Sequence, residues 1–318
     1  MCIERNKNLH SAKKKKNDEF YTTYDTISKE LVNYSTDYFK GKIVYCPCDI
    51  ADDSCSIMSQ FVKYFKDNKK RLGYKRLIAT CYTENISVVI RGNRYEFSDE
   101  VENYSWCECD DIYLSGDFRS DECRQIMSEC DIVVTNPPFS LFKEFFSQIL
   151  EYKKDYIILG SINSLNFDIV FNEFKYNRCT FGYTIRNGHT KFLVPSTYKS
   201  EFERSKFDVN GNKYVEVGVR WFSNVCNLVR PVLTLNEVPI DSFECYNNSD
   251  IIHIEKTSQI PKGHNGLMGV PITFLDKWNT SQFELLGIIF PSRYFGNISC
   301  YSCIGDKKYY ARLLIKAV

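Results

Sequence analysis

Residues 131–142 read DIVVTNPPFSLF and combine a buried strand with an abrupt corner. Residues 132–135 are β-prone, and they are followed by an amide, two prolines and an aromatic ring. A proline fixes its own φ, restricts the residue before it to extended geometry and donates no backbone hydrogen bond. The corner at residues 136–139 is therefore stiff and presents mainly hydrogen-bond acceptors.

Apolar runs on both sides of this corner alternate with segments of helical period. Strands are expected at residues 42–46, 77–82, 111–115, 131–135 and 155–159. Between the last two strands, apolar residues recur at the spacing of one helix face, which predicts an amphipathic helix with a buried face: Phe142, Phe145, Phe146, Ile149 and Leu150. Strands that alternate with helices are typical of a parallel sheet covered by helices, so the expected fold class is α/β.

The pattern changes beyond about Thr180. The Asn-Gly pairs at 187–188 and 210–211 are typical of tight turns, and KYVEVGVRWFSNV at 213–225 alternates as an antiparallel strand does. We expect three parts. Residues 1–17 form a polar arm, residues 18–180 form the α/β domain, and residues 181–318 form a mixed α+β region that partly completes the sheet.

The charges of the chain nearly cancel. It has 318 residues, with 41 Lys and Arg against 40 Asp and Glu. This balance excludes a global basic field, so any contact with phosphate needs a local patch. The densest basic run is Lys13, Lys14, Lys15 and Lys16. Such an arm either follows a phosphate backbone or is a solvated tail.

Fourteen cysteines raise the question of disulfides or a metal site. The N-terminus is rich in Lys and Asn rather than apolar, and no apolar run approaches the ~18 residues of a membrane span. We therefore expect a cytoplasmic chain without a membrane partner, in which free buried thiols act as small apolar side chains. No paired Cys-x-x-Cys array occurs, so no metal is expected.

The corner has a specific chemical capacity. In a doubly wound sheet, ligands bind outside the carboxyl ends of the strands, where Asn136 falls. The Asn136 side-chain oxygen and the Pro137 carbonyl can each accept a proton from one NH2 group. The amine of a nucleobase is a poor nucleophile because its lone pair is delocalised. Two acceptors on one side favour a tetrahedral nitrogen that is aligned for attack. Pro138 stiffens this arrangement, and Phe139 would stack on the ring. Alternatively, Asn136 caps the strand end and Phe139 only packs against the next helix.

Four blocks of the sequence resemble the EcoRI-type family of adenine-specific DNA methyltransferases. They are DEFYTTYDTI at 18–27, SGDFRS at 115–120, DIVVTNPPFS at 131–140 and GLMGVPITFL at 266–275, in the order that this family uses. The third block contains the Asp/Asn/Ser-Pro-Pro-aromatic signature of S-adenosylmethionine-dependent enzymes that methylate exocyclic amines or planar amides. The resemblance implies a Rossmann-like methyltransferase sheet, S-adenosyl-L-methionine as the cofactor and a C-terminal target-recognition region.

The resemblance also implies residue roles. The corner at residues 136–139 would hold a flipped adenine. Tyr21 and Thr22 would contact the methionine end of the cofactor. Asp117 and Phe118 would contact the cofactor's adenine, with the carboxylate accepting from its amine. The alternative for Asp117 is helix capping.

Two further cofactor contacts follow from strand ends. A carboxylate at a strand tip is the usual partner of ribose hydroxyls, which nominates Glu84 after the strand at 77–82, although simple solvation is the alternative. Most methyltransferases carry a glycine-rich turn after the first strand, whereas no glycine occurs at 46–56. The segment from Cys46 to Asp49 must therefore turn differently, and Asp49 is a candidate for the cofactor's ammonium group. The missing glycines also disfavour a dinucleotide-binding fold.

A target base inside a duplex must be flipped out before it can react. Sequence reading then falls to the region from about 180 to 260. The side chains there that suit base edges are Arg186, Asn187, Lys191, Arg220 and Asn224.

Three functions are compatible with these features. The first is a site-specific DNA adenine N6-methyltransferase, either in a restriction-modification system or alone, acting as a monomer on double-stranded DNA. The second is an RNA adenine or protein glutamine methyltransferase. The third is a methyltransferase-like protein that binds DNA without turnover.

Overall fold

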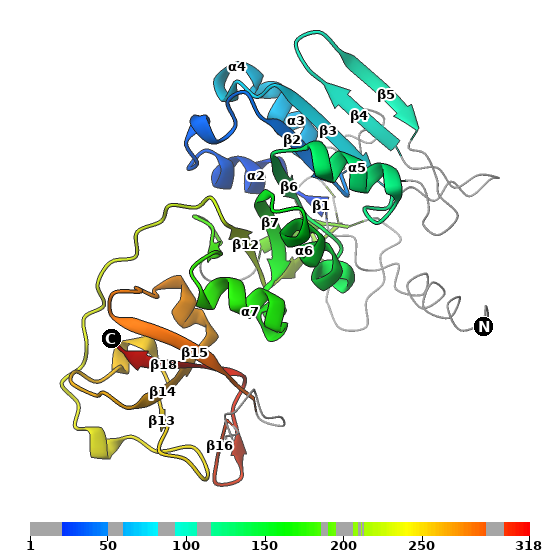
Figure 1. Ribbon diagram of the computed structural model, residues 1–318. Helices are drawn as coiled ribbons and strands as arrows, with labels where there is room; N and C mark the ends of the chain where they lie inside the picture. The colour runs from blue at the N-terminus through cyan, green and yellow to red at the C-terminus, as the bar shows by residue number, and fades with distance from the viewer. Residues whose placement is uncertain are drawn as a thin grey trace. The chain divides into compact units, whose positions relative to one another are not determined.

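The computed structural model describes residues 21–49, 60–81, 93–106, 116–185, 190–194, 206–208, 211, 213–290 and 302–318. Figure 1 shows the chain from its N-terminus in blue to its C-terminus in red. Two compact units are present, the first formed by Met1–Ser164 with Gly182–Cys226 and the second by Leu165–Phe181 with Asn227–Val318. The predicted boundary after residue 180 divides the chain only once. In the structure, the chain enters the second unit at Leu165, returns to the first unit at Gly182 and enters the second unit again at Asn227.

A large mixed sheet forms the centre of the first unit. Its parallel strands, in spatial order, are β3 (Arg76–Cys81), β2 (Ile43–Pro47), β6 (Ile132–Thr135) and β7 (Asp155–Ser161). Antiparallel strands extend both edges: β4 (Asn93–Phe97) and β5 (Glu102–Trp106) beyond β3, and β12 (Val219–Ser223) beyond β7. The expected α/β class is confirmed. The predicted strand at 111–115 lies outside the described residues.

The central strands are mostly apolar because both faces of the sheet are covered. All four residues of β6 are fully buried. Helices α2 (Tyr24–Leu31), α3 (Gln60–Asp67), α5 (Asp121–Glu129) and α6 (Phe142–Glu151) belong to this unit. The predicted helix after the prolines is α6, so this prediction is confirmed.

The packing of α6 on the sheet is close. The Phe142 ring lies 5.7 Å from Phe146 and 5.3 Å from Phe222 of β12, measured between centroids. A side chain at Gly160 of β7 would place its Cβ 2.3 Å from the Phe142 ring, so only glycine fits there. These contacts fix the helix that follows the proline corner.

A smaller antiparallel sheet in the same unit contains, in order, β1 (Tyr21–Thr22), β9 (Thr190–Leu193), β11 (Lys213–Val217) and β10 (Lys206–Phe207). The alternating run at 213–225 therefore forms two strands rather than one. The chain passes from β11 to β12, and thus from one sheet to the other, at Gly218. As a result, β12 from beyond residue 181 pairs with β7.

The second unit has a sheet of its own. In spatial order its strands are β13 (Ile252–His253), β14 (Leu267–Pro271), β18 (Arg312–Ala317) and β15 (Phe283–Ile289), and α7 (Asp168–Lys175) contacts β15. Its core includes Met268, Phe283, Leu313 and Ile315, which are almost completely buried. The block GLMGVPITFL lies here, in β14 and the 3-10 turn Ile272–Asp276. Across the described residues, no helix combines the length and apolar character needed to cross a bilayer.

Candidate functional site

The proline corner lies at the carboxyl end of β6. Pro137 is buried, whereas Asn136, Pro138 and Phe139 are each partly exposed. Phe139 opens the short 3-10 turn Phe139–Leu141, whose Leu141 N–H donates to the Pro138 carbonyl at 3.0 Å. Phe139 is partly exposed, whereas Phe142, which follows it in α6, is fully buried.

A buried hydrogen bond joins this corner to the next strand of the sheet. The Thr135 hydroxyl, which is fully buried, donates to the Pro47 carbonyl at the end of β2. Because β2 and β6 are parallel neighbours, both strands end at the same edge. The turn after β2 and the corner after β6 are therefore adjacent.

The glycine-free turn after β2 uses a cysteine in the left-handed region. Cys48 has φ +63°, a conformation that costs a residue with a Cβ about 1–2 kcal/mol. It directs the chain so that Asp49 is buried, with its N–H donating to the Thr80 carbonyl of β3 at 3.2 Å. The Asp49 Oδ2 accepts from the Val62 N–H at 3.1 Å, in the first turn of α3. This carboxylate thus stabilises a helix N-terminus.

Two thiols belong to the end of β2 and the turn that follows it. Cys46 is fully buried in β2, and its pKa is raised well above the ordinary value, mainly by burial and further by Asp49. Burial also raises the pKa of Cys48, and the neighbouring Asp117 carboxylate raises it further. Both thiols are consequently protonated at neutral pH. The Asp117 carboxylate belongs to the SGDFRS block.

In that block, Asp117 is held by Arg119. The carboxylate accepts from Arg119 Nε at 2.9 Å, from Nη2 at 2.6 Å and from the backbone N–H at 2.9 Å. Phe118 is only 4% exposed and packs edge-on against Phe145, at 5.1 Å between centroids. Gln148 Nε2 donates to the Phe118 carbonyl at 3.0 Å. The Phe118 ring therefore belongs to the core in this structure.

Tyr21 and Thr22 form β1, opposite Leu193 and Phe192 of β9. Thr22 is 6% exposed, and its hydroxyl oxygen is buried without a hydrogen-bond partner in the described part of the chain. A buried polar atom without a hydrogen bond destabilises the folded protein, and a ligand that supplies the missing hydrogen bond removes this cost. This observation fits a ligand-contact role for the segment.

The predicted DNA-contact residues are scattered. Lys191 in β9 is exposed, and its Nζ lies 4.9 Å from the centroid of the Tyr214 ring. Arg220 in β12 is 4% exposed, pairs in register with Gly160 near the carboxyl end of β7 and donates from Nη1 to the Val219 carbonyl at 2.9 Å. The predicted residues outside the described ranges are Lys13, Lys14, Lys15, Lys16, Glu84, Arg186 and Asn187.

Asn224 lies at the other edge of the sheet. Its Oδ1 accepts from the Tyr156 N–H at 2.7 Å, and its Nδ2 donates to the Lys154 carbonyl at 3.2 Å. These groups are at the amino end of β7, whereas the proline corner is at the carboxyl end of β6. The amide of Asn224 thus completes the backbone hydrogen bonding of β7 and is not offered to a base edge.

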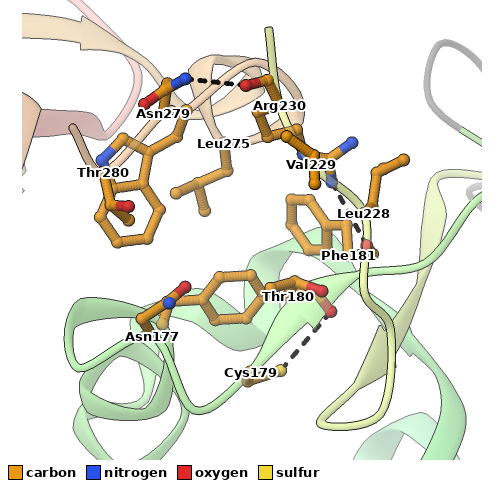
Figure 2. Close-up of a pocket in the computed structure, with 12 residues that line it drawn as sticks. Asn177, Cys179, Thr180, Phe181, Leu228, Val229, Arg230, Leu275, Asn279 and Thr280 are labelled. Carbon is orange, nitrogen blue, oxygen red and sulfur yellow. Dashed lines mark hydrogen bonds between the residues drawn. The ribbon is translucent and has the colours of Figure 1, made fainter. Parts of the chain in front are cut away.

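The second unit contains a pocket of about 260 Å³ (Figure 2). Phe181 and Trp278 contribute aromatic rings to its lining, and Arg230 spans one wall. Arg230 Nη2 donates to the Phe181 carbonyl at 3.3 Å, and Asn279 Nδ2 donates to the Arg230 carbonyl at 2.7 Å. None of the predicted site residues lines this pocket. Within the described ranges, no cluster of three or more His, Cys, Asp or Glu could hold a metal ion.

Cys48 and Thr135 are parts of the site that the sequence analysis did not nominate. The absence of glycine at 46–56 indicates an unusual turn, but no local pattern states which residue takes positive φ. No sequence signal identifies the bond between Thr135 and Pro47, because it joins residues that are 88 positions apart.

This chain is similar to known methyltransferases over most of its length. The family model described as "Adenine-specific methyltransferase EcoRI" matches residues 8–311. The Type II methyltransferase M.EcoRI of Escherichia coli is 40% identical over 299 residues, covering 88% of this chain and 89% of that protein. The Type II methyltransferases M.MgeORF184P of Mycoplasma genitalium and M.MpnI of Mycoplasma pneumoniae are each 33% identical, covering 87% of this chain and 85% and 84% of those proteins. No solved structure shows significant similarity. The chain therefore belongs to the EcoRI family of adenine-specific methyltransferases.

Proposed function

We propose that this protein is a site-specific DNA adenine N6-methyltransferase of a restriction-modification system, acting on a flipped adenine in duplex DNA. The observation that carries the proposal is the corner at residues 136–139. It lies at the carboxyl edge of a parallel sheet, with a partly exposed aromatic ring, in a chain of an adenine-specific methyltransferase family. The strand order β3-β2-β6-β7-β12, with β12 antiparallel, supports a Rossmann-like methyltransferase sheet.

In this proposal the corner holds the amine of the target base. Asn136 Oδ1 and the Pro137 carbonyl each accept one N–H of the adenine amine, so the nitrogen becomes tetrahedral and its lone pair points away from both acceptors. Pro138 keeps the backbone rigid, and Phe139 stacks on the purine ring. After methyl transfer the nitrogen is strongly acidic, and its extra proton passes to water. Alignment and exclusion of water provide the rate enhancement, so no dedicated base is required.

S-adenosyl-L-methionine supplies an electrophilic methyl group bound to a sulfonium. The residues proposed to hold it are Tyr21 and Thr22 at the methionine end and Asp117 at the adenine end, together with the turn from Cys46 to Asp49. The unsatisfied Thr22 hydroxyl supports this assignment. A carboxylate has about four lone-pair positions, and Asp117 uses three of them for Arg119, so one remains for an amine. Phe118 contributes from the core behind Asp117, and Glu84 is proposed for the ribose.

DNA contacts are proposed for the basic arm and for the region around β9. The arm carries Lys13, Lys14, Lys15 and Lys16, which suit a phosphate backbone. Arg186, Asn187, Lys191 and Arg220 are the proposed readers of base edges. One monomer then modifies the two strands of a site in separate binding events.

Transfer of a tritiated methyl group from S-adenosyl-L-methionine to duplex DNA, RNA and bulk protein, assayed in parallel, tests this function. We expect label in duplex DNA alone, recovered as N6-methyladenine after digestion. Label that appears only in RNA or only in protein would contradict the proposal. Binding of DNA and cofactor without any label would indicate a protein that has lost turnover.

A further inference from the structure

A buried carboxylate in α2 lies outside the roles described above. Glu30 has no solvent exposure. Its Oε1 accepts from the Tyr34 hydroxyl at 2.9 Å and from the Tyr183 N–H at 2.8 Å. Its Oε2 accepts from the Thr184 N–H at 2.7 Å and from the Thr184 hydroxyl at 2.5 Å. In the part of the chain that the structure describes, no cation pairs with it.

Burial of a carboxylate is unfavourable unless hydrogen bonds replace the lost water. Glu30 has four such bonds, and three come from a segment more than 150 residues away in the sequence. The backbone there is pressed against the carboxylate. A Cβ at Gly182 would lie 2.1 Å from Glu30 Oε1 and 2.7 Å from the Cβ of Trp221. The position of the segment 182–184 is therefore fixed by its hydrogen bonds to Glu30 and by the close packing at Gly182.

The contact between Glu30 and residues 182–184 is close in sequence to two candidate functional segments, β1 and β9. Residues 182–184 lead through Ile185, which has φ +53°, towards β9. Strand β9 pairs with β1, and β1 immediately precedes the helix that carries Glu30. Residues 182–184 are thus tied to α2 through Glu30, and β9 is tied to β1 by strand pairing. Helix α2 itself is anchored by Ile27 and Leu31, both fully buried, so its position does not depend on Glu30.

We propose that Glu30 is a positioning residue for DNA recognition. It fixes the segment 182–184, which precedes β9, and thereby helps to hold Lys191 of β9 relative to the cofactor-contact strand β1. This inference rests on the proposed function, because it assigns the segment a role in reading DNA. Glu30 touches neither substrate nor cofactor in this account, and it acts through the two backbone N–H groups that it holds.

The test is Glu30→Gln. The amide has nearly the same shape as the carboxylate, but one of its two acceptor oxygens is replaced by an NH2 donor. The segment 182–184 therefore loses some of the hydrogen bonds that hold it. Because the segment 182–184 loses hydrogen bonds to a charged group, we expect KM for duplex DNA to rise by roughly tenfold or more. Amide exchange at Tyr183 and Thr184 should accelerate to a similar degree. The Kd for S-adenosyl-L-methionine should stay within about threefold, because α2 keeps its own anchors.

Tyr34→Phe is the matched control. It removes a bond to the same carboxylate but none to the segment 182–184, so KM for DNA and exchange at Tyr183 should match wild type. Assays well below both melting temperatures keep the folded fractions equal. If Glu30→Gln does not fold, Thr184→Val removes only the hydroxyl bond and should raise KM in the same direction.

Three results would overturn the inference. The first is a wild-type KM for DNA in Glu30→Gln or, if that variant does not fold, in Thr184→Val. The second is a rise of KM in Tyr34→Phe that equals the rise in Glu30→Gln. The third is a loss of cofactor affinity in Glu30→Gln that is as large as its change in KM. Failure of the proposed function is distinguishable from failure of this inference, because wild-type protein would then methylate no DNA. Amide exchange would still report whether Glu30 holds the segment 182–184.

Discussion

The turn after β2 and the corner after β6 follow neighbouring parallel strands and end at the same edge of one sheet. The corner after β6 is fixed by two prolines, whose φ values are set before folding. The turn after β2 instead holds Cys48 in the left-handed region, where a Cβ is unfavourable. The buried bond from Thr135 to Pro47 joins them.

The two corners also use their polar groups differently. Asn136 remains partly exposed at the edge of the sheet, whereas Asp49 is buried and accepts from the first turn of α3. A rigid corner can hold a ligand without reorganising. A strained turn that buries its carboxylate organises the framework around it. This difference supports our proposal of base chemistry for the corner after β6 and of cofactor support for the turn after β2.

The largest expected effect comes from Asn136→Ala. Loss of an alignment contact in the transition state should reduce the methylation rate by ~100-fold or more, while cofactor affinity changes little. Single-turnover kinetics and cofactor titration measure the two quantities. Asn136→Asp keeps an acceptor oxygen and should retain more activity than the alanine variant. Unchanged turnover in Asn136→Ala would remove the role given to this residue.

Phe139→Ala should weaken retention of the flipped base by roughly 1–3 kcal/mol, because stacking on the ring is lost. A 2-aminopurine at the target position reports the flipped state: wild type should increase its fluorescence, and the variant should do so less. Equal fluorescence combined with a lower melting temperature would instead show that the ring only packs against α6.

Thr135→Val tests the connection between the two corners. The valine has the shape of threonine but leaves the buried Pro47 carbonyl without its donor, which should reduce the free energy of unfolding by about 1–3 kcal/mol. Thr135→Ser keeps the hydroxyl and should recover most of this loss beyond the cost of the missing methyl group. Denaturant unfolding measures both, and equal losses in the two variants would contradict a role for the bond.

Cys48 gives the smallest but most specific effect. Glycine is normally less stable than alanine, but at positive φ the order should reverse, because only alanine carries the unfavourable Cβ. Cys48→Gly should therefore be more stable than Cys48→Ala by about 1 kcal/mol, although both variants lose the same thiol. The opposite order in thermal unfolding would show that the turn is not strained.

Local patterns predict the elements around the site well. The helix after the prolines follows from the spacing of Phe142, Phe145 and Phe146, and all three rings are buried as expected. The strands at residues 42–46, 131–135 and 155–159 follow from continuous apolar runs and agree with β2, β6 and β7 within two residues. These predictions succeed because helix and strand periodicity depend on residues close together in sequence.

Long-range contacts are not predictable in the same way. Glu30 lies 153 positions from its partner Tyr183, and neither segment carries a local sign of the other. The return of residues 182–226 to the first unit depends on the pairing of β12 with β7, which periodicity does not specify. Asn224 shows the same limit, because its amide suits a base edge by composition but is bonded to the backbone of β7.

A crystal structure with a cofactor analogue and a duplex oligonucleotide containing the target site tests the central claim most directly. We expect an extruded adenine stacked on Phe139, with its amine nitrogen within about 2.7–3.2 Å of both Asn136 Oδ1 and the Pro137 carbonyl. We also expect that the free side of this nitrogen faces the transferable methyl group. An adenine that remains stacked in the duplex, or a corner covered by protein and remote from the cofactor's sulfur, would contradict the account.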